Sequence, residues 1–384
     1  MEDLPVAIRL NPFKTPQSEL PILKGSVQVP WSPYGRILTE RPVFTLHPLF
    51  HAGCYYVQDS SAMFVGHVFR SVLGEACGRL RVLDLCAAPG GKTTDLAASL
   101  RERCGDDFLL VSNEVMKQRA GILDDNVARW GDPNVVVTSV DPAAFAAFEG
   151  FFDLIVADVP CSGEGMFRKD ARAEQEWSPE VVKLCAARQK RILADVWPSL
   201  KKDGFLIYST CTYEEAENDD NLEWAASELG GCIVAPDNEF AGYGVRTTRC
   251  GHLLKAGEVP GEGQWVGSMR RTSATDCEVD DESLLHRLHP LRMGLKKGEM
   301  KGKNFVPDAD WALSINFEMD AYPCVEVDKQ TALHFLHRDA LNIPGAPLGY
   351  LTLTYRGVPI GFVKNIGNRC NNLHPQGRRI LMDI

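Results

Sequence analysis

The sequence predicts an α/β fold whose largest part is a mainly parallel, doubly wound, Rossmann-like sheet. Between residues 81 and 211, five apolar runs rich in β-branched residues alternate with segments of helical periodicity. The first run, VLDL at 82–85, is followed at once by a glycine turn and a helix, the unit with which such sheets begin. Continuous apolar strands indicate a sheet covered by helices on both faces.

Each element follows from the local pattern. Ser60 or Ser61 is expected to cap a first helix that carries Met63, Phe64, Val68 and Val72 on one face. Seven strands are then expected at 81–86, 108–114, 134–141, 152–160, 204–211, 232–236 and 263–271. Helical segments are expected between them at 93–104, 116–130, 141–148, 178–200 and 213–230.

The chain divides into four expected segments. Residues 1–50 are rich in proline and weakly periodic, and they predict a small N-terminal α/β lobe; residues 51–271 carry the alternation and predict the main domain. Residues 272–283 are polar and acidic, which is typical of a linker. Residues 284–384 contain strands that meet across a turn at Arg356–Gly357, and they predict a compact, mainly β module.

Composition narrows the class of protein. With 384 residues, 45% of them hydrophobic, the chain can bury a sizeable core. Its twelve cysteines are scattered without CxxC pairs, which favours reduced thiols and a cytoplasmic protein over a disulfide scaffold or a zinc ribbon. No apolar run is long enough to span a bilayer, and the first residues lack a signal-peptide pattern. No metal site and no obligate protein partner is expected.

The formal charge of −10 counts against a general nucleic-acid coat protein, although an RNA enzyme needs only a local basic face. One candidate face is 292–303, RMGLKKGEMKGK, with five basic residues and one acid. A second candidate is Arg378–Arg379. An ordinary solvated surface is the alternative for both.

The glycine turn CAAPGGKT at 86–93 suits a bound cofactor. Gly90 and Gly91 can adopt backbone angles that are closed to other residues, and Thr93 or Thr94 is expected to cap the helix that follows. The dinucleotide pattern GxGxxG fails, because Lys92 and Asp95 occupy the later glycine positions.

The phosphate-loop pattern GxxxxGK[ST] half matches, since Gly91, Lys92 and Thr93 fit but Cys86 replaces the first glycine. Asp84, just before the turn, suits a cationic ligand better than a triphosphate. S-adenosylmethionine carries an ammonium and a sulfonium, so the turn favours this methyl donor. A phosphate-loop nucleotide hydrolase is the alternative.

A polar residue lies at or near the end of each of the five core strands, and the carboxyl ends of parallel strands converge on one crevice. Glu114 lies about twenty residues after the glycine turn, where an acid typically binds ribose hydroxyls; a solvated loop acid is the alternative. Asp141 could accept a hydrogen bond from an adenine amino group, or cap the helix that begins at Pro142. The full set is Asp84, Glu114, Asp141, Asp158 and Cys211.

Two cysteines follow neighbouring strands, Cys161 in DVPCSGEG and Cys211 in YSTCT. A lone cysteine is usually a small buried hydrophobic residue, but two in one crevice suit covalent catalysis. Carbon 5 of cytosine is a poor nucleophile until a thiolate adds to carbon 6, and Asp158 could hydrogen-bond the ring as charge develops. The second thiol could then assist release. The run FDLIVA before Asp158 also fits the metal-binding strand of a phosphate-loop enzyme.

Three motifs, DLCAAPGGKT, DVPCSGEG and STCT, closely resemble in their order and spacing the Sun/Nop family of RNA cytosine-5 methyltransferases. The resemblance covers about residues 5–271. LNPFKT, QDSSAM and GMFRKD resemble the bacterial ribosomal-RNA branch, and GYLTLTYRGVPIGFVKNIGNR is similar to the RNA-binding PUA-like module of that branch. The resemblance therefore implies a methyltransferase catalytic domain at 51–271 and a PUA-like module at 284–384.

By this resemblance, Cys211 is the nucleophile, Cys161 assists product release, and Asp158 faces the cytosine. The implied substrate is RNA, with 16S ribosomal RNA expected and tRNA as the alternative. Spacing alone does not choose between the two thiols. The implied ligands of S-adenosylmethionine are Ala87, Ala88, Pro89, Gly90, Gly91, Lys92, Thr93, Glu114, Asp141 and Asp158.

The chain departs from the family pattern in two places. Val159 replaces the usual alanine, and the chain begins close to RLNP, before which the family normally has a helical segment. Lys169 resembles a family position near the substrate, with an exposed surface charge as the alternative. A non-catalytic RNA-binding or ribosome-assembly factor is a third hypothesis, although such a protein has no need for two thiols in one crevice.

Overall fold

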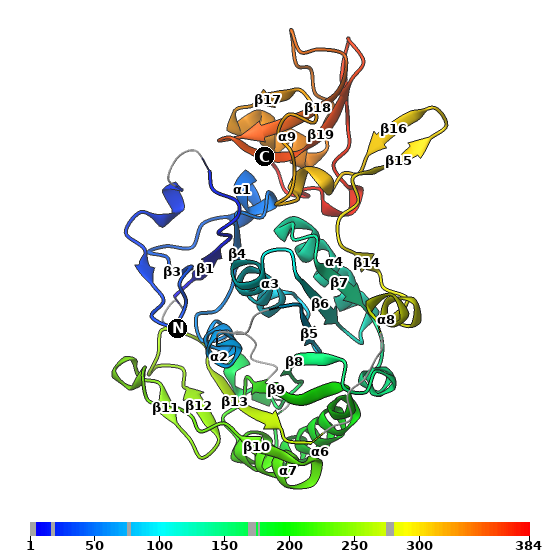
Figure 1. Cartoon of the computed structure of the whole chain (residues 1–384). Helices are drawn as coiled ribbons and strands as arrows, with labels where there is room; N and C mark the ends of the chain where they lie inside the picture. Colours follow the sequence, from blue (N-terminus) through cyan, green and yellow to red (C-terminus); the bar gives the residue numbers. More distant parts are fainter. Residues whose placement is uncertain (1–4, 17–19, 75–77, 168–173, 176, 274–279) are drawn as a thin grey trace.

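The computed structural model describes residues 5–16, 20–74, 78–167, 174–175, 177–273 and 280–384 (Figure 1). Lys169 and half of the expected linker, residues 274–279, lie outside these residues. No helix among the described residues has both the length and the apolar character needed to cross a membrane.

The N-terminal lobe is a small antiparallel sheet with the strand order β2-β3-β1-β4. The boundary expected at residue 50 falls inside the lobe, because β4 pairs with β1 and places Val57 opposite Ile8. A short helix, α1 (Pro48–His51), precedes β4. The strands are β1 (Ala7–Leu10), β2 (Val27–Gln28), β3 (Gly35–Ile37) and β4 (Tyr55–Val57).

The main sheet has ten strands, and its five central strands are parallel in the order β9-β8-β5-β6-β7. The strand order reverses between β5 and β8, and ligands of such sheets bind at the carboxyl ends on either side of that point. The five are β5 (Leu80–Asp84), β6 (Phe108–Asn113), β7 (Val135–Thr138), β8 (Phe152–Asp158) and β9 (Leu200–Thr210).

Antiparallel strands extend this sheet at both edges. Next to β9 lies β13, which pairs with both β12 and β10, while the two-residue strand β14 pairs with β7. The hairpin of β11 and β12 was not expected from the sequence. These strands are β10 (Gly231–Ile233), β11 (Arg246–Thr247), β12 (Gly251–Leu254), β13 (Gln264–Arg271) and β14 (Arg292–Met293).

Helices cover both faces of the main sheet, as predicted. Val82 of β5 packs into the cluster that contains α2, α3 and α4, whereas its neighbour Leu83 packs into the cluster of α6, α7 and α8. Residues 141–148 differ from the prediction, because they form a 3-10 helix at Pro142–Ala147. The helices are α2 (Phe64–Leu73), α3 (Gly91–Cys104), α4 (Lys117–Trp130), α6 (Pro179–Val196), α7 (Asp219–Leu229) and α8 (Asp281–Leu288).

The boundary expected at 283/284 falls inside α8. Leu284 and Leu288 are buried in the same cluster as Leu83, and β14 then places Arg292 opposite Val137 of β7. Both elements therefore pack on the main domain. We propose that the C-terminal module begins after β14.

A separate hairpin follows, and then the C-terminal sheet of order β17-β18-β19-β20 with helix α9 (Lys329–His337). The predicted turn at Arg356–Gly357 is confirmed, since Tyr355 pairs with Val358 and both turn residues have positive φ, 54° and 75°. The strands are β15 (Gly298–Lys301), β16 (Asn304–Pro307), β17 (Cys324–Glu326), β18 (Gly349–Tyr355), β19 (Val358–Asn365) and β20 (Cys370–Asn372).

The N-terminal lobe and the C-terminal module share one hydrophobic core. Ile8 and Leu49 of the lobe lie in the same buried cluster as Phe335 of α9 and Leu351 of β18 (Figure 1). Two segments at opposite ends of the chain therefore form one unit beside the main sheet.

Candidate active site at the strand ends

The glycine turn links the end of β5 to α3. Gly90 has a φ of 111° and caps α3, whose first residue is Gly91. The capping role expected of Thr93 and Thr94 is wrong, because the helix starts before them. Instead, the Thr93 hydroxyl donates to Asp84 Oδ2 at 2.6 Å, and the Thr94 hydroxyl donates to the carbonyl oxygen of Gly90 at 2.9 Å.

A cavity of about 190 Å³ opens beside this turn and reaches β8. Six of the predicted cofactor residues line it, while Gly90, Thr93, Glu114 and Asp141 do not. The lining also includes Tyr56, Gln58, Asp59, Ala62 and Cys86, together with the predicted Ala87, Ala88, Pro89, Gly91, Lys92 and Asp158.

Asp84 lies beneath the turn and is fully buried. Burial raises the pKa of its carboxyl group to about 7, and among the described residues its Oδ1 has no hydrogen-bond partner. A buried carboxylate with an unsatisfied oxygen is stabilised by a cation nearby. These features fit S-adenosylmethionine, whose methionine part is cationic.

Glu114 and Asp141 follow β6 and β7. Glu114 accepts a hydrogen bond from the backbone N–H of Met116 at 3.0 Å and lies 3.3 Å from Arg119, which donates to the carbonyl oxygen of Ala88. The side chain of Asp141 accepts from the backbone N–H of Ala143 at 3.0 Å. Glu114 is thus linked to the glycine turn, whereas the capping alternative for Asp141 is confirmed.

The carboxylate of Asp158, at the end of β8, is held by three donors. Lys92 Nζ lies 2.7 Å from Oδ2, while Ser209 and Gln264 donate to Oδ1 at 2.7 and 3.0 Å. Burial alone would lower the pKa of Lys92, but Asp158 raises it above its ordinary value, so Lys92 carries its positive charge here. The lysine of the half-matched phosphate loop therefore has a carboxylate partner.

The two predicted thiols meet at the same edge. Cys161 Sγ lies 3.2 Å from Cys211 Sγ, and the loop after β8 is held to β9 by a bond from the Gly165 N–H to the Cys211 carbonyl oxygen at 2.8 Å. A hydrogen bond from Cys161, aided by Lys92, lowers the pKa of Cys211, and the same bond with burial raises the pKa of Cys161. Cys211 is therefore the more acidic of the two thiols.

A buried polar network positions the Cys161 loop. The carboxylate of Glu217 accepts from the Ser162 N–H at 3.1 Å and from Gln189 Nε2 at 2.7 Å, and Gln189 also donates to the carbonyl oxygen of Pro160 at 3.0 Å. The Ser162 hydroxyl lies 3.0 Å from that of Thr212. The loop carrying one thiol is therefore fixed relative to the loop carrying the other.

Arg9 of β1 connects the N-terminal lobe to the glycine turn. Its guanidinium is completely buried and donates to Gln58 Oε1 and to the carbonyl oxygen of Gly91, each at 3.0 Å, and to the Thr94 hydroxyl. The N-terminal lobe therefore supports the turn that lines the cavity.

The sequence interpretation assigned no site role to several of these residues. Arg9 and Gln58 belong to the stretches RLNP and QDSSAM, which resemble the family but carry no pattern that predicts a site role. The family resemblance was therefore the one feature of the sequence that pointed to them. Gln264 and Glu217 have no motif of their own and are identified by their contacts.

Two arginines of the segments expected to form a basic face for RNA, Arg292 and Arg378, form ion pairs within the protein instead. Arg292 pairs with Asp124 at 2.5 Å and Asp310 at 3.0 Å, and Arg378 pairs with Asp310 and, at 3.4 Å, with Asp125. These two arginines hold the C-terminal module against α4. The lysines of 296–303 are exposed.

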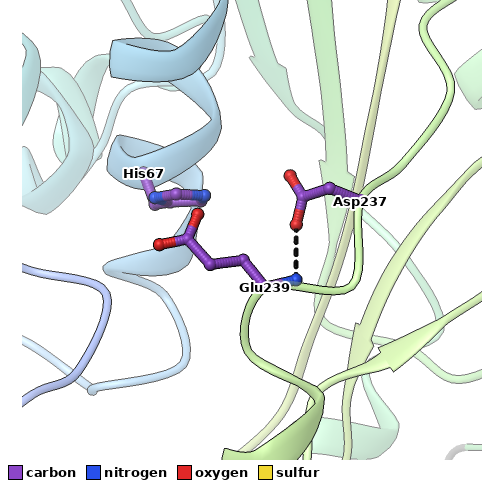
Figure 2. Close-up of side chains that lie close together, drawn as sticks. All are labelled: His67, Asp237 and Glu239. Carbon is purple, nitrogen blue, oxygen red and sulfur yellow. Dashed lines mark hydrogen bonds between the residues drawn. The ribbon is translucent and has the colours of Figure 1, made fainter.

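Among the described residues, one cluster of side chains has the chemistry and spacing to hold a metal ion. His67 of α2 points toward the carboxylates of Asp237 and Glu239, in the loop after β10, and their ligand atoms lie within 4.8 Å of one another (Figure 2). The sequence interpretation named no metal ligand. The cluster belongs to elements other than the strand ends that carry the two thiols.

Comparison with known proteins gives a consistent result. The family described as 16S rRNA methyltransferase RsmB/F matches residues 76–229. The N-terminal domain of 16S rRNA methyltransferase RsmF matches 1–60, and the methyltransferase RsmF PUA domain matches 322–380. Ribosomal RNA small subunit methyltransferase F of Pectobacterium atrosepticum is 35% identical over 384 residues, covering 85% of this chain and 77% of that protein. The chain belongs to the RsmB/F family.

Other relatives agree. The Escherichia coli protein of the same name is 28% identical over 96% of this chain and 89% of its own length. The chain is thus an S-adenosylmethionine-dependent rRNA methyltransferase of the RsmB/F family with an N-terminal and a PUA domain.

Solved structures share the fold. A methyltransferase homologue from Pyrococcus horikoshii has a TM-score of 0.58 at 26% identity, covering 70% of this chain and 87% of that one. NSun6 from the same organism has a TM-score of 0.50 at 22% identity, covering 62% of this chain and 60% of that one.

The ten cysteines among the described residues are all free, as the sequence predicts.

Proposed function

We propose that Cys211 is the nucleophile with which this 16S rRNA cytosine-5 methyltransferase attacks its base, and that Cys161 assists product release. The observation that carries the proposal is the 3.2 Å separation of the two sulfur atoms beside the held carboxylate of Asp158. Two thiols at this distance serve a reaction in which one adds and the other aids its departure.

The chain's own residues account for each step. The Cys211 thiolate forms a bond to carbon 6 of cytosine, and the electron pair of the 5,6 double bond moves to carbon 5. Asp158 lies next to Cys211 and can accept a hydrogen bond from the amino edge of the base. The target base must be unpaired or flipped to reach this crevice.

When bound, S-adenosylmethionine supplies an electrophilic methyl group. Ala87, Ala88, Pro89, Gly91 and Lys92, which line the cavity, would hold it, and the buried carboxylate of Asp84 beneath the turn would offset its positive charge. Glu114, which is held by Arg119 beside the glycine turn, would bind the ribose.

Release then needs a base. The proton on carbon 5 leaves, the bond between Cys211 and carbon 6 breaks, and the 5,6 double bond returns. Cys161 can take this proton once it has lost its own proton to solvent. The hydrogen bond to Cys211 is the chief cause that raises the pKa of Cys161, and this cause is gone when Cys211 is bonded to carbon, so the loss becomes easier.

Methylation mapping tests the function. Purified protein is incubated with unmodified 16S rRNA, or with small subunits, and S-adenosylmethionine, and bisulfite sequencing then locates 5-methylcytosine. A defined cytosine in 16S rRNA is expected. Methylation of tRNA alone would contradict the substrate, and RNA binding without any methyl transfer would favour a non-catalytic factor.

The phosphate-loop alternative has a separate test. Lys92 is paired with Asp158 and Cys86 stands in place of the first glycine, so neither end of the turn fits a triphosphate. Calorimetry should detect binding of S-adenosylhomocysteine and none of magnesium–ATP. The reverse result would contradict the proposal.

A further inference from the structure

The hairpin of β15 and β16 stands apart from the other sheets. Its two strands pair only with each other among the described residues, and the hairpin projects beside the C-terminal sheet (Figure 1). It also lies outside the three segments matched by family descriptions, 1–60, 76–229 and 322–380. The activity described above assigns it no task.

The hairpin concentrates positive charge on an acidic protein. Residues 296–303 carry four exposed lysines against one glutamate, while the whole chain has a formal charge of −10. The lysine ion pairs are weak ones between exposed groups, from Lys297 to Glu318 at 3.9 Å and from Lys301 to Glu299 at 3.0 Å. Among the described residues, Lys296 and Lys303 have no ion-pair partner.

Apolar side chains are exposed on the same hairpin. Met300 and Phe305 are 64% and 43% exposed, and they lie opposite each other in the strand ladder, so they share one face. An aromatic ring exposed among lysines is the combination with which proteins bind single-stranded nucleic acid, because bases stack on the ring while the cations neutralise phosphates.

The surface continues onto the C-terminal sheet. Leu373, which follows β20 of the C-terminal sheet, lines one cavity together with Lys301 and Val306 of the hairpin, so the hairpin lies beside this sheet. Lys364 lies over the ring of Tyr350 at 5.0 Å. Basic and aromatic groups therefore occur on the hairpin and on the neighbouring sheet.

We propose that the β15–β16 hairpin binds an unpaired segment of the substrate RNA, with a base stacked on Phe305 and phosphates on Lys301 and Lys303. This proposal rests on the proposed function, because it takes the substrate to be ribosomal RNA. The excess of lysine favours an anionic partner. An acidic protein surface on the assembled subunit is the competing occupant.

Binding of naked 16S rRNA at several salt concentrations tests the proposal. Phe305→Ala should weaken binding about tenfold through the lost stacking. Lys301→Ala/Lys303→Ala should make the slope of log K against log salt shallower by about 1.4, since each phosphate contact in a single strand contributes about 0.7. Tyr243→Ala, at a ring that is even more exposed than Phe305, and Lys202→Ala, at an exposed lysine on β9, are the matched controls.

Methylation kinetics supply the second readout. The hairpin variants should raise KM for RNA and leave kcat unchanged, because the hairpin contacts none of the reacting atoms. Thermal melts that match the wild type would show that the variants are folded. An unchanged affinity and salt slope on naked RNA would overturn the proposal, and a loss seen only on assembled subunits would assign the hairpin to a protein surface.

Failure of the proposed function gives a different pattern. A wild-type protein that binds 16S rRNA in a hairpin-dependent manner but transfers no methyl group would contradict the catalytic proposal alone. A wild-type protein that methylates normally while all variants bind like the controls would contradict the hairpin proposal alone.

Discussion

Cys161 Sγ lies 3.2 Å from Cys211 Sγ although 50 residues separate the two cysteines in the chain. The separation results from adjacent parallel strands, β8 and β9, which end at the same edge of the sheet. At this distance one thiol donates a hydrogen bond to the other, and the two protonation equilibria become linked.

Replacing Cys161 should therefore change the acidity of Cys211. In Cys161→Ala the hydrogen bond that lowers the pKa of Cys211 is lost, while burial and Asp158 still raise it, so the pKa should increase. Alkylation by iodoacetamide, followed at the Cys211 peptide by mass spectrometry, should reach its midpoint at higher pH than in the wild type. Cys161→Ser, which retains a donor, is the control, and an unchanged midpoint in Cys161→Ala would contradict the linkage.

Asp158 should be needed for turnover beyond its part in folding. Asp158→Asn removes the anionic acceptor and leaves Lys92 partly buried without its partner, so kcat should fall by about 10²–10³-fold and stability by about 1–3 kcal/mol. Asp153→Asn, at the other end of the same strand, is the matched control and should retain kcat. Steady-state kinetics and urea unfolding check both variants, and equal kcat values would refute the role.

Asp84 should make the ligand-free protein less stable as pH rises. Its folded pKa is about 7 against an ordinary 3.8, so between these values the folded state retains a proton that the unfolded state has lost. The free energy of unfolding should thus fall with increasing pH through this window, by about 3 kcal/mol between pH 5 and pH 8. Urea unfolding of Asp84→Asn should lack this component, and the variant should be the more stable protein at pH 8. An identical pH dependence in both proteins would show that Asp84 is ionised throughout.

Arg9 should couple the N-terminal lobe to the cofactor. Arg9→Met removes the bonds to Gln58 and to the Gly91 carbonyl oxygen and leaves buried acceptors unpaired, which should cost about 3–5 kcal/mol of stability and raise KM for S-adenosylmethionine. Arg36→Met, on the neighbouring strand β3, should change neither quantity greatly. A Arg9→Met protein with wild-type KM would show that the lobe does not support the turn.

Local patterns predicted much of this molecule because local physics decides it. The apolar run before Asp84 forms a strand whatever packs on it, and Gly90 must lie where a positive φ is required. Likewise, the rule that the carboxyl ends of parallel strands meet at one edge predicted that Cys161 and Cys211 lie close together. The prediction of Thr93 as a cap was wrong because the helix already begins at Gly91, and the Thr93 hydroxyl instead donates to Asp84 in a different element.

Long-range packing set the features that the sequence did not reveal. Residue 284 was placed in the C-terminal module, but its leucine is buried against the main sheet. Arg292 and Arg378 lie in basic segments of the kind that bind RNA. Both point inward because they pair with Asp310, which is distant from Arg378 in sequence. Gln264 reaches Asp158 only because β13 lies beside β9.

Covalent trapping of RNA tests the central assignment of the two cysteines most directly. Cys161→Ala and Cys211→Ala proteins are incubated with 16S rRNA and S-adenosylmethionine and separated on a denaturing gel. Cys161→Ala should retain a protein–RNA adduct that survives denaturation, because the bond from Cys211 to carbon 6 forms but is not efficiently broken, whereas Cys211→Ala should give none. An adduct with Cys211→Ala, or full methylation by both variants without any adduct, would contradict the two-thiol mechanism.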